Sequence, residues 1–251
     1  MTAADRVTYV GHATVLLELD DVRLITDPVL RSRVGPLRRQ GARPSPGIAD
    51  DIDAVLISHL HQDHADLPSL RRFRRDVPML VPPGARAFFQ RQGFVAVSEL
   101  AAGESRQVKG VTVTATEATH EVTRRSVSKT EAIGFLADGA RRIYFAGDTD
   151  LFDGMEALKG SLDLALLPIW GWGPNLGAGH LNPKRAARAA AMLEPRITVP
   201  IHWGTLYPLG LSRLRPRPLH LPPHEFEAQM REHAPQVEVR VLAPGEATSL
   251  S

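Results

Sequence analysis

The sequence lacks cysteine, and this absence restricts the chemistry that the protein can perform. None of its 251 residues is a cysteine. Disulfide bonds, thiolate nucleophiles and thiolate metal ligands are therefore excluded. A metal ion in this protein must be bound by histidine, aspartate or glutamate side chains.

Long apolar runs and Pro/Gly-rich linkers are also missing. No uninterrupted apolar stretch approaches the length that spans a bilayer, and residues 1–6 lack the apolar core of a secretory signal. We therefore expect a cytoplasmic protein without integral membrane association. Because no linker divides the chain, we also expect a single domain over residues 1–251, which is long enough for one large hydrophobic core.

Neither sign of charge dominates the composition. The chain has 30 Lys and Arg residues against 28 Asp and Glu residues, which gives a net charge of +2 despite a pI near 9.2. This excess is too small to indicate a nucleic-acid partner. Only four of the basic residues are lysines, and genomic base composition is a sufficient explanation for the scattered arginines.

Histidine and aspartate are concentrated directly after an apolar run. Residues 54–57 are typical of a buried strand, and His59, His61, Asp63 and His64 follow them. Alternation at the end of a strand directs the first two histidines to the same side, and the other two residues reach the same space from the following turn. Four imidazole and carboxylate ligands suit zinc or another borderline first-row ion. A solvated histidine-rich turn is the alternative, but it does not require this spacing.

The HxHxDH spacing resembles the signature of the metallo-β-lactamase superfamily. The resemblance implies an α/β fold, a four-layer αββα sandwich of two similar halves, with two metal ions at one rim. It also requires three further ligands along the chain, and His120, Asp148 and His202 each follow a strand candidate. The aspartate at the position of Asp148 bridges the two metals in this family. The implied metal ligands are His59, His61, Asp63, His64, His120, Asp148 and His202.

Strand patterns support this resemblance because they occur twice. In each half, two strands joined by a tight turn precede a buried strand, which favours two similar sheets. The matching segments are residues 14–19, 22–26 and 53–58 in the first half and residues 133–137, 143–146 and 163–168 in the second. Helices are expected over residues 67–75, 85–92 and 183–192, and further strands over residues 79–81 and 95–97.

Four more residues are candidates for positions around the metals. The resemblance gives Asp27, at the end of a strand candidate, a hydrogen bond to a ligand imidazole. His12 lies in a turn, where a lone histidine is usually structural. Trp172 and His180 lie in the glycine-rich residues 171–180, whose backbone can approach a ligand closely. We expect His12, Asp27 and Trp172 either to contact the substrate or to hold the metal ligands in place.

Three short motifs indicate a branch of the superfamily. The Gly-His-Ala-Thr segment, the Trp-Gly-Trp-Gly loop and the Ile-His-Trp-Gly-Thr segment are similar to those of a branch that includes L-ascorbate-6-phosphate lactonase and the N-acyl-phosphatidylethanolamine-hydrolysing phospholipase D. The similarity spans nearly the whole chain.

Residues 31–47 show no periodic apolar pattern and predict an irregular loop. It carries several prolines and five arginines, namely Arg31, Arg33, Arg38, Arg39 and Arg43. One interpretation is a basic lid over the metal site, which would favour an anionic substrate. The other is a solvated surface loop, and the sequence does not decide between them.

The resemblance implies hydrolysis by a metal-bridging hydroxide. The expected substrate is a small, anionic ester, lactone or phosphodiester, and the expected cofactors are two divalent ions, Zn²⁺ first and Mn²⁺ or Fe²⁺ as alternatives. Asp63 and Asp148 would accept hydrogen bonds or protons from the nucleophile. His180 would stabilise the developing oxyanion or protonate the leaving group.

Two other functions remain open from the sequence. An iron-dependent oxidoreductase would share the scaffold, but flavin-coupled diiron relatives typically carry glutamate at the position of His61. The second is a binding or scaffold role without catalysis. A protein with such a role would be expected to have lost some of the metal ligands. The sequence does not give the substrate, the resident metal or whether the chain forms a homo-oligomer.

Overall fold

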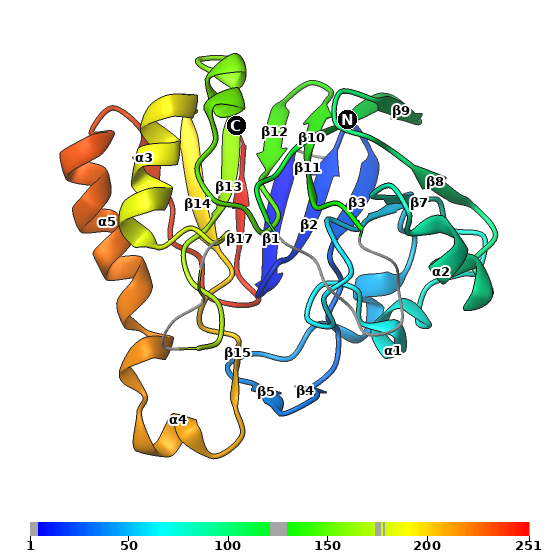
Figure 1. Cartoon of the computed structure of the whole chain (residues 1–251), viewed down its shortest axis with the longest axis horizontal. Coiled ribbons are helices and arrows are strands. Elements are labelled where there is room, and N and C mark those ends of the chain that lie inside the picture. Colours follow the sequence, from blue (N-terminus) through cyan, green and yellow to red (C-terminus); the bar gives the residue numbers. More distant parts are fainter. Residues whose placement is uncertain (1–4, 121–129, 174–176, 178, 251) are drawn as a thin grey trace.

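Two seven-stranded sheets pack face to face, with helices on both outer surfaces (Figure 1). The computed structural model describes residues 5–120, 130–173, 177 and 179–250. The first sheet has the order β17 (Ala247–Ser249), β1 (Arg6–Gly11), β2 (Thr14–Leu19), β3 (Val22–Thr26), β6 (Ala54–Leu56), β7 (Met79–Val81) and β8 (Val97–Glu99). The second has the order β16 (Glu238–Val239), β14 (Ile197–Ile201), β13 (Leu164–Pro168), β12 (Arg142–Phe145), β11 (Ile133–Asp138), β10 (Val111–Glu117) and β9 (Ser105–Val108). The expected αββα sandwich is confirmed.

Helices and a small third sheet complete the described part of the chain. The α-helices are α1 (Leu67–Leu70), α2 (Arg86–Arg91), α3 (Pro183–Leu193), α4 (Leu211–Leu214) and α5 (Leu221–His233). The third sheet has the order β15 (Leu206–Pro208), β5 (Leu37–Arg39) and β4 (Arg33–Val34). Short 3₁₀ turns are η1 (Pro46–Ala49), η2 (Asp153–Leu158) and η3 (Arg217–Leu219). Among the described residues, no helix has the length and apolar character needed to cross a membrane.

Side-chain alternation in β2 supplies two separate hydrophobic layers. Val15 and Leu17 point into the layer between the two sheets, where they join Phe135 of β11. Leu16 points to the opposite face and belongs to the layer that includes Phe89 of α2. Because successive strand side chains point to opposite faces, one short segment stabilises the contact between the sheets and the contact with the outer helices.

Helices α3 and α5 cover the outer face of the second sheet, on the left of Figure 1. Asn182 begins α3 by accepting a hydrogen bond from the backbone N–H of Arg185 at 2.9 Å, and Pro183 occupies the first helical position. The buried face of α3 is rich in alanine. Strands β13 and β14 are buried along their whole length, as parallel strands covered on both faces require.

The internal repeat predicted from the sequence is confirmed by the strand pairing. In the first sheet, β2 pairs with β3 antiparallel and β3 pairs with β6 parallel. In the second sheet, β11 pairs with β12 antiparallel and β12 pairs with β13 parallel. The end of β3 therefore corresponds to the end of β12, and the end of β6 corresponds to the end of β13. These ends lie at the same rim of the sandwich (Figure 1).

Two predicted element boundaries were wrong. The helix expected over residues 67–75 ends as α1 at Leu70, because the following hydrogen bonds run from Arg72 to Ser69 and from Phe73 to Leu70 in the shorter i→i+3 pattern. The strand expected over residues 95–97 begins only at Val97 and forms β8.

The prediction of an irregular loop over residues 31–47 was also wrong. These residues form the β4–β5 hairpin and the turn η1, and β5 pairs with β15 in the second half of the chain. The pairing places this small sheet below the ends of the main strands in Figure 1. Its partner strand is remote in sequence, so the local pattern gave no sign of it.

We expect the layer between the sheets to dominate stability. Leu17→Ala should lower the free energy of unfolding by about 2–5 kcal/mol, because Leu17 is 1% exposed and its truncation leaves a cavity. The same substitution at Leu214, which is 81% exposed, should change it by less than about 0.5 kcal/mol. Urea denaturation of both variants measures the difference, and equal losses would contradict this description of the core.

Candidate metal centre

The seven predicted metal ligands are brought together at the rim where the main strands end. Residues 59–64 follow β6, His120 follows β10, Asp148 follows β12 and His202 follows β14. Strands β6, β12 and β14 are largely buried and β10 buries every second side chain, so the polar side chains that follow them lie at the edge of the core. Residues that are distant in sequence therefore share one space, as expected from the resemblance.

His59, His61 and His120 form the first group. The Nε2 atom of His59 lies 2.9 Å from Nδ1 of His61, and Nε2 of His120 lies 3.2 Å from the same atom. These three nitrogen atoms are close enough to bind one metal ion together. Two of the three rings come from the HxH segment, and the third comes from the opposite sheet.

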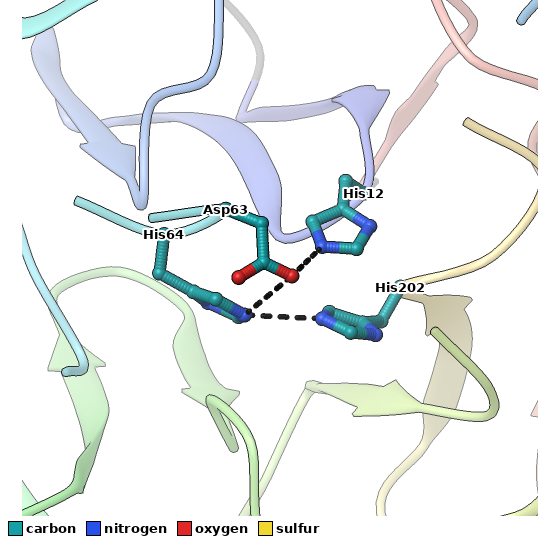
Figure 2. A group of neighbouring side chains, drawn as sticks. All are labelled: His12, Asp63, His64 and His202. Atoms are coloured by element: carbon teal, nitrogen blue, oxygen red, sulfur yellow. Dashed lines mark hydrogen bonds and ion pairs between the residues drawn. The ribbon is translucent and has the colours of Figure 1, made fainter. Parts of the chain in front are cut away.

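Asp63, His64 and His202 form the second group together with His12 (Figure 2). The Nε2 atoms of His64 and His202 are 3.1 Å apart, and Oδ2 of Asp63 lies 3.9 Å from Nε2 of His64. Figure 2 shows the four side chains converging from the β1–β2 turn, the segment after β6 and the end of β14.

Asp148 lies between the two groups. Its Oδ2 atom is 3.2 Å from Nε2 of His64 and 4.0 Å from Nε2 of His59, and its Oδ1 atom is 3.2 Å from Nε2 of His202. Only 4% of this side chain is exposed. A carboxylate in this position can direct its oxygen atoms toward both groups.

The orientation of four rings is fixed through their Nδ1 atoms. A neutral imidazole that donates a hydrogen bond from Nδ1 presents an unshared electron pair at Nε2. Nδ1 of His64 lies 2.8 Å from Oδ2 of Asp27, and Nδ1 of His59 lies 3.0 Å from Oγ of Ser58. The other two rings bond to backbone oxygens: His202 to that of Trp170 at 2.7 Å, and His120 to that of Gly179 at 2.8 Å.

This arrangement fits a bound cation. Metal binding requires His64 and His202 to be deprotonated. In that form their Nε2 atoms have no proton to share across 3.1 Å, so their electron pairs repel unless a metal ion lies between them. Oδ1 of Asp148 is buried and accepts no hydrogen bond from the described residues. Nitrogen and oxygen donors of this kind are the ligands of zinc and related first-row ions.

Four histidines of the site favour their neutral forms, and His64 is the exception. Burial by itself lowers the pKa of His64, but the carboxylates of Asp148 and Asp27 outweigh it and raise this pKa well above its usual value. Burial lowers the pKa of His61 to about 4 and the pKa of His202 to about 3, despite the nearby carboxylates. Burial also lowers the pKa of His59 and of His120. Deprotonated imidazole is the form that binds a metal ion, so these four rings are prepared for binding at neutral pH.

The two aspartates favour their ionised forms. Burial by itself raises the pKa of Asp63, but the hydrogen bond from His12 and the charge of His64 outweigh it and hold this pKa well below its usual value. For Asp148 the same effect of burial is outweighed by His202 and His64. The site thus combines neutral nitrogen donors with negative oxygen donors.

Two of the predicted supporting residues contact the group around Asp63. His12 donates from Nε2 to Oδ2 of Asp63 at 3.0 Å, and the indole N–H of Trp172 donates to the same oxygen atom at 3.1 Å. The ring of His12 also lies 3.8 Å from that of His202, measured between centroids. His12 is fully buried, whereas 39% of Trp172 is exposed.

Asp27 supports two histidines at once. Its Oδ2 atom accepts the hydrogen bond from His64, and it also accepts one from Oγ of Ser58 at 2.5 Å. Ser58 in turn lies against Nδ1 of His59. The sequence analysis did not identify Ser58, although its position between an apolar strand and the first histidine could have indicated this role.

His180 lies at the edge of the cluster. Its Nε2 atom is 3.7 Å from Oδ2 of Asp148, and its ring lies edge-on to that of His120 at 4.6 Å between centroids. About 20% of its side chain is exposed, more than for the buried ligands. Of the glycine-rich segment that carries it, residues 174–176 and 178 lie outside the described residues.

Two arginines of residues 31–47 support the structure rather than cover the site. Arg31 holds both carboxylate oxygens of Asp66, which begins α1. Arg39 is 7% exposed and donates to the backbone oxygens of Val10 and Val29. Hydrogen bonds fix Arg31, and burial with hydrogen bonds fixes Arg39, so a basic lid could use only Arg33, Arg38 and Arg43.

Known proteins share both the sequence and the fold of this chain. Residues 22–203 match the β-lactamase superfamily domain. The N-acyl-phosphatidylethanolamine-hydrolysing phospholipase D 1 of Caenorhabditis elegans is 34% identical over 243 residues, which cover 84% of this chain and 67% of that protein. A UPF0173 metal-dependent hydrolase of Methanopyrus kandleri is 32% identical over 251 residues, which cover 96% of this chain and 98% of that protein.

A solved structure gives the same result for the fold. Igni18, a metallo hydrolase from the archaeon Ignicoccus hospitalis, superposes with a TM-score of 0.74 at 24% identity and covers 98% of each chain. The matched domain includes residues 59–64, Asp148 and His202. The chain therefore belongs to the metallo-β-lactamase superfamily and is a metal-dependent hydrolase of that superfamily.

Proposed function

We propose that the protein is a dinuclear hydrolase whose two metal ions share Asp148. The observation that carries this proposal is the position of Asp148, whose two oxygen atoms lie 3.2 Å from His64 and from His202 while the same carboxylate also faces His59. His59, His61 and His120 would hold one ion. Asp63, His64 and His202 would hold the other.

Two bound divalent ions would supply a hydroxide nucleophile at neutral pH and polarise the bond to be hydrolysed. The aspartates of this chain are suited to orient that nucleophile rather than to store its proton, because Asp63 and Asp148 both have strongly lowered pKa values. Two hydrogen bonds, from His12 and Trp172, fix the orientation of the Asp63 carboxylate. An ionised, oriented carboxylate accepts a hydrogen bond without moving.

His180 is the group best placed to supply a proton. It lies next to Asp148 and His120, and about 20% of its side chain is exposed, whereas His59, His64 and His202 are buried, so a substrate can reach it. Its imidazole can donate to a leaving group or to developing negative charge during hydrolysis.

The substrate that we propose is a small anionic ester, lactone or phosphodiester. Arg33 and Arg38 are exposed on the β4–β5 hairpin, and the tip of this hairpin at Gly35 approaches Gln62, a neighbour of Asp63 in the chain. Arginine binds phosphate and carboxylate groups through paired hydrogen bonds. The relative named for hydrolysis of N-acyl-phosphatidylethanolamine is consistent with a phosphodiester.

The protein reconstituted with Zn²⁺ should carry close to two ions per chain. Asp148→Asn should bind about one ion or fewer and lose turnover, because an amide is a poor bridge between two cations. The matched control is Asp138→Asn, at the half-exposed last residue of β11, which should retain both ions. Elemental analysis measures the metal content, and one ion in the wild-type protein would contradict the dinuclear proposal.

Iron bound to the natively purified protein, together with oxygen-dependent turnover, would favour the oxidoreductase alternative.

His180→Ala should retain both metals and lose turnover on the order of a hundredfold, the usual scale for a removed acid or oxyanion group. Elemental analysis and steady-state kinetics of the same preparation provide the two measurements. His224→Ala, at a side chain that is 76% exposed, serves as the control and should change neither. Loss of metal from the His180 variant would show that this residue is a ligand.

Replacing Arg33 and Arg38 together by Gln should raise KM for an anionic ester more than for a neutral chromogenic ester, because only the anion loses a cationic partner. The effect on the anion should decrease as salt screens the charges. The control is the pair Arg86→Gln and Arg91→Gln on α2, two exposed arginines. Equal effects on both esters would place charge selection elsewhere.

A further inference from the structure

Basic and acidic residues are unevenly distributed along this chain, although the net charge is small. Residues 28–49 and 195–224 contain no Asp or Glu but hold nine of the 30 Lys and Arg residues. The rest of the chain then carries 21 basic residues against all 28 acidic ones. The two acid-free stretches are far apart in sequence, so neither reveals this separation alone.

The fold joins the two stretches into one projection, which we call the basic lobe and define as residues 33–39 and 206–221. Tyr207 of β15 pairs with Arg38 of β5, and the backbone N–H of Leu209 donates to the backbone oxygen of Pro36 at 3.0 Å. Figure 1 shows β4, β5, β15 and α4 below the ends of the main strands, where the metal centre lies. His12 is tied to the same region through Thr205.

The basic lobe exposes both charge and apolar surface. Arg33 and Arg38 lie directly opposite each other in the β4–β5 pair, an arrangement of like charges that destabilises a hairpin unless an anion offsets it. The segment after β15 adds three exposed arginines and three exposed leucines. These are Arg213, Arg215, Arg217, Leu209 at 55% exposure, Leu214 at 81% and Leu221 at 46%.

The segment that carries these exposed side chains after β15 is fixed to the rest of the fold. The hydroxyl of Tyr207 donates to the backbone oxygen of Arg215 at 3.0 Å, and Leu219 is 5% exposed. Gly210 takes a left-handed conformation with φ of 81° and begins α4. The fold thus buries Tyr207 and Leu219, which flank this segment, and leaves the side chain of Leu214 in the solvent.

We propose that the basic lobe docks the protein on an anionic phospholipid surface. Arginines bind lipid phosphates, and exposed leucines enter the boundary of the acyl chains, so the two kinds of exposed side chain serve one partner. A nucleic acid would account for the arginines only. Single strands are usually bound by stacking on aromatic rings, and Trp203 and Tyr207 beside the lobe are buried. The docking does not depend on the hydrolytic chemistry.

The test is flotation of the full chain with phosphatidylcholine vesicles, with and without phosphatidylglycerol. The wild-type protein should bind only the anionic vesicles, and high salt should weaken binding. Replacing Arg213, Arg215 and Arg217 by Gln should lower the affinity on the order of a hundredfold. The matched control replaces three other exposed arginines, Arg86, Arg91 and Arg106, by Gln and should retain binding.

Leu214→Ser separates lipid docking from general attraction to polyanions. The variant should bind anionic vesicles more weakly but bind duplex DNA or heparin as the wild-type protein does, because only a bilayer takes up the leucine. Circular dichroism of every variant confirms its fold. Absence of vesicle binding, equal loss in the control triple variant, or stronger binding to duplex DNA than to vesicles would overturn the proposal.

Discussion

The imidazole nitrogens at the rim impose the strongest constraint on this structure. Four rings are each held through Nδ1 by a carboxylate, a hydroxyl or a backbone oxygen, so their Nε2 electron pairs face one another around Asp148. Such a cluster needs a positive charge, from a bound metal ion or from a proton on His64, whose pKa is raised by the carboxylates of Asp148 and Asp27 despite its burial. It also needs a rigid support. Two sheets that end at the same rim provide this rigidity, and the core between them stabilises it.

Three residues beside the metal centre have unusual backbone conformations. His12, Asp27 and His202 have positive φ values of 59°, 35° and 63°, in a region that residues other than glycine rarely adopt. Each conformation costs of order 1 kcal/mol or more and persists because its surroundings determine it. The backbone N–H of His202 donates to the oxygen of His12, so two of these residues stabilise each other. Of the eight described non-glycine residues with positive φ, these three lie beside the metal centre, and the other five lie in turns or at a helix end.

The small third sheet connects the chemistry to the surface. The buried guanidinium of Arg39 holds the backbone before His12, and burial lowers its pKa to about 10. On the outer side, the same hairpin carries exposed arginines close to the segment of the HxHxDH motif. One element therefore positions a supporting residue of the site and also forms part of the basic lobe.

The sequence alone determined the strand repeat and the group at residues 59–64, because apolar strands that end in histidine or aspartate are local patterns. The resemblance of the HxHxDH motif to the superfamily supplied the sandwich and the selection of His120, Asp148 and His202 among the other strand ends. The tertiary structure decided what depends on distant partners. It paired β5 with β15, buried Arg39, tied Arg31 to Asp66 and joined two acid-free stretches into one lobe. The physical reason is that burial and hydrogen bonding between remote segments leave no periodic signal in either segment.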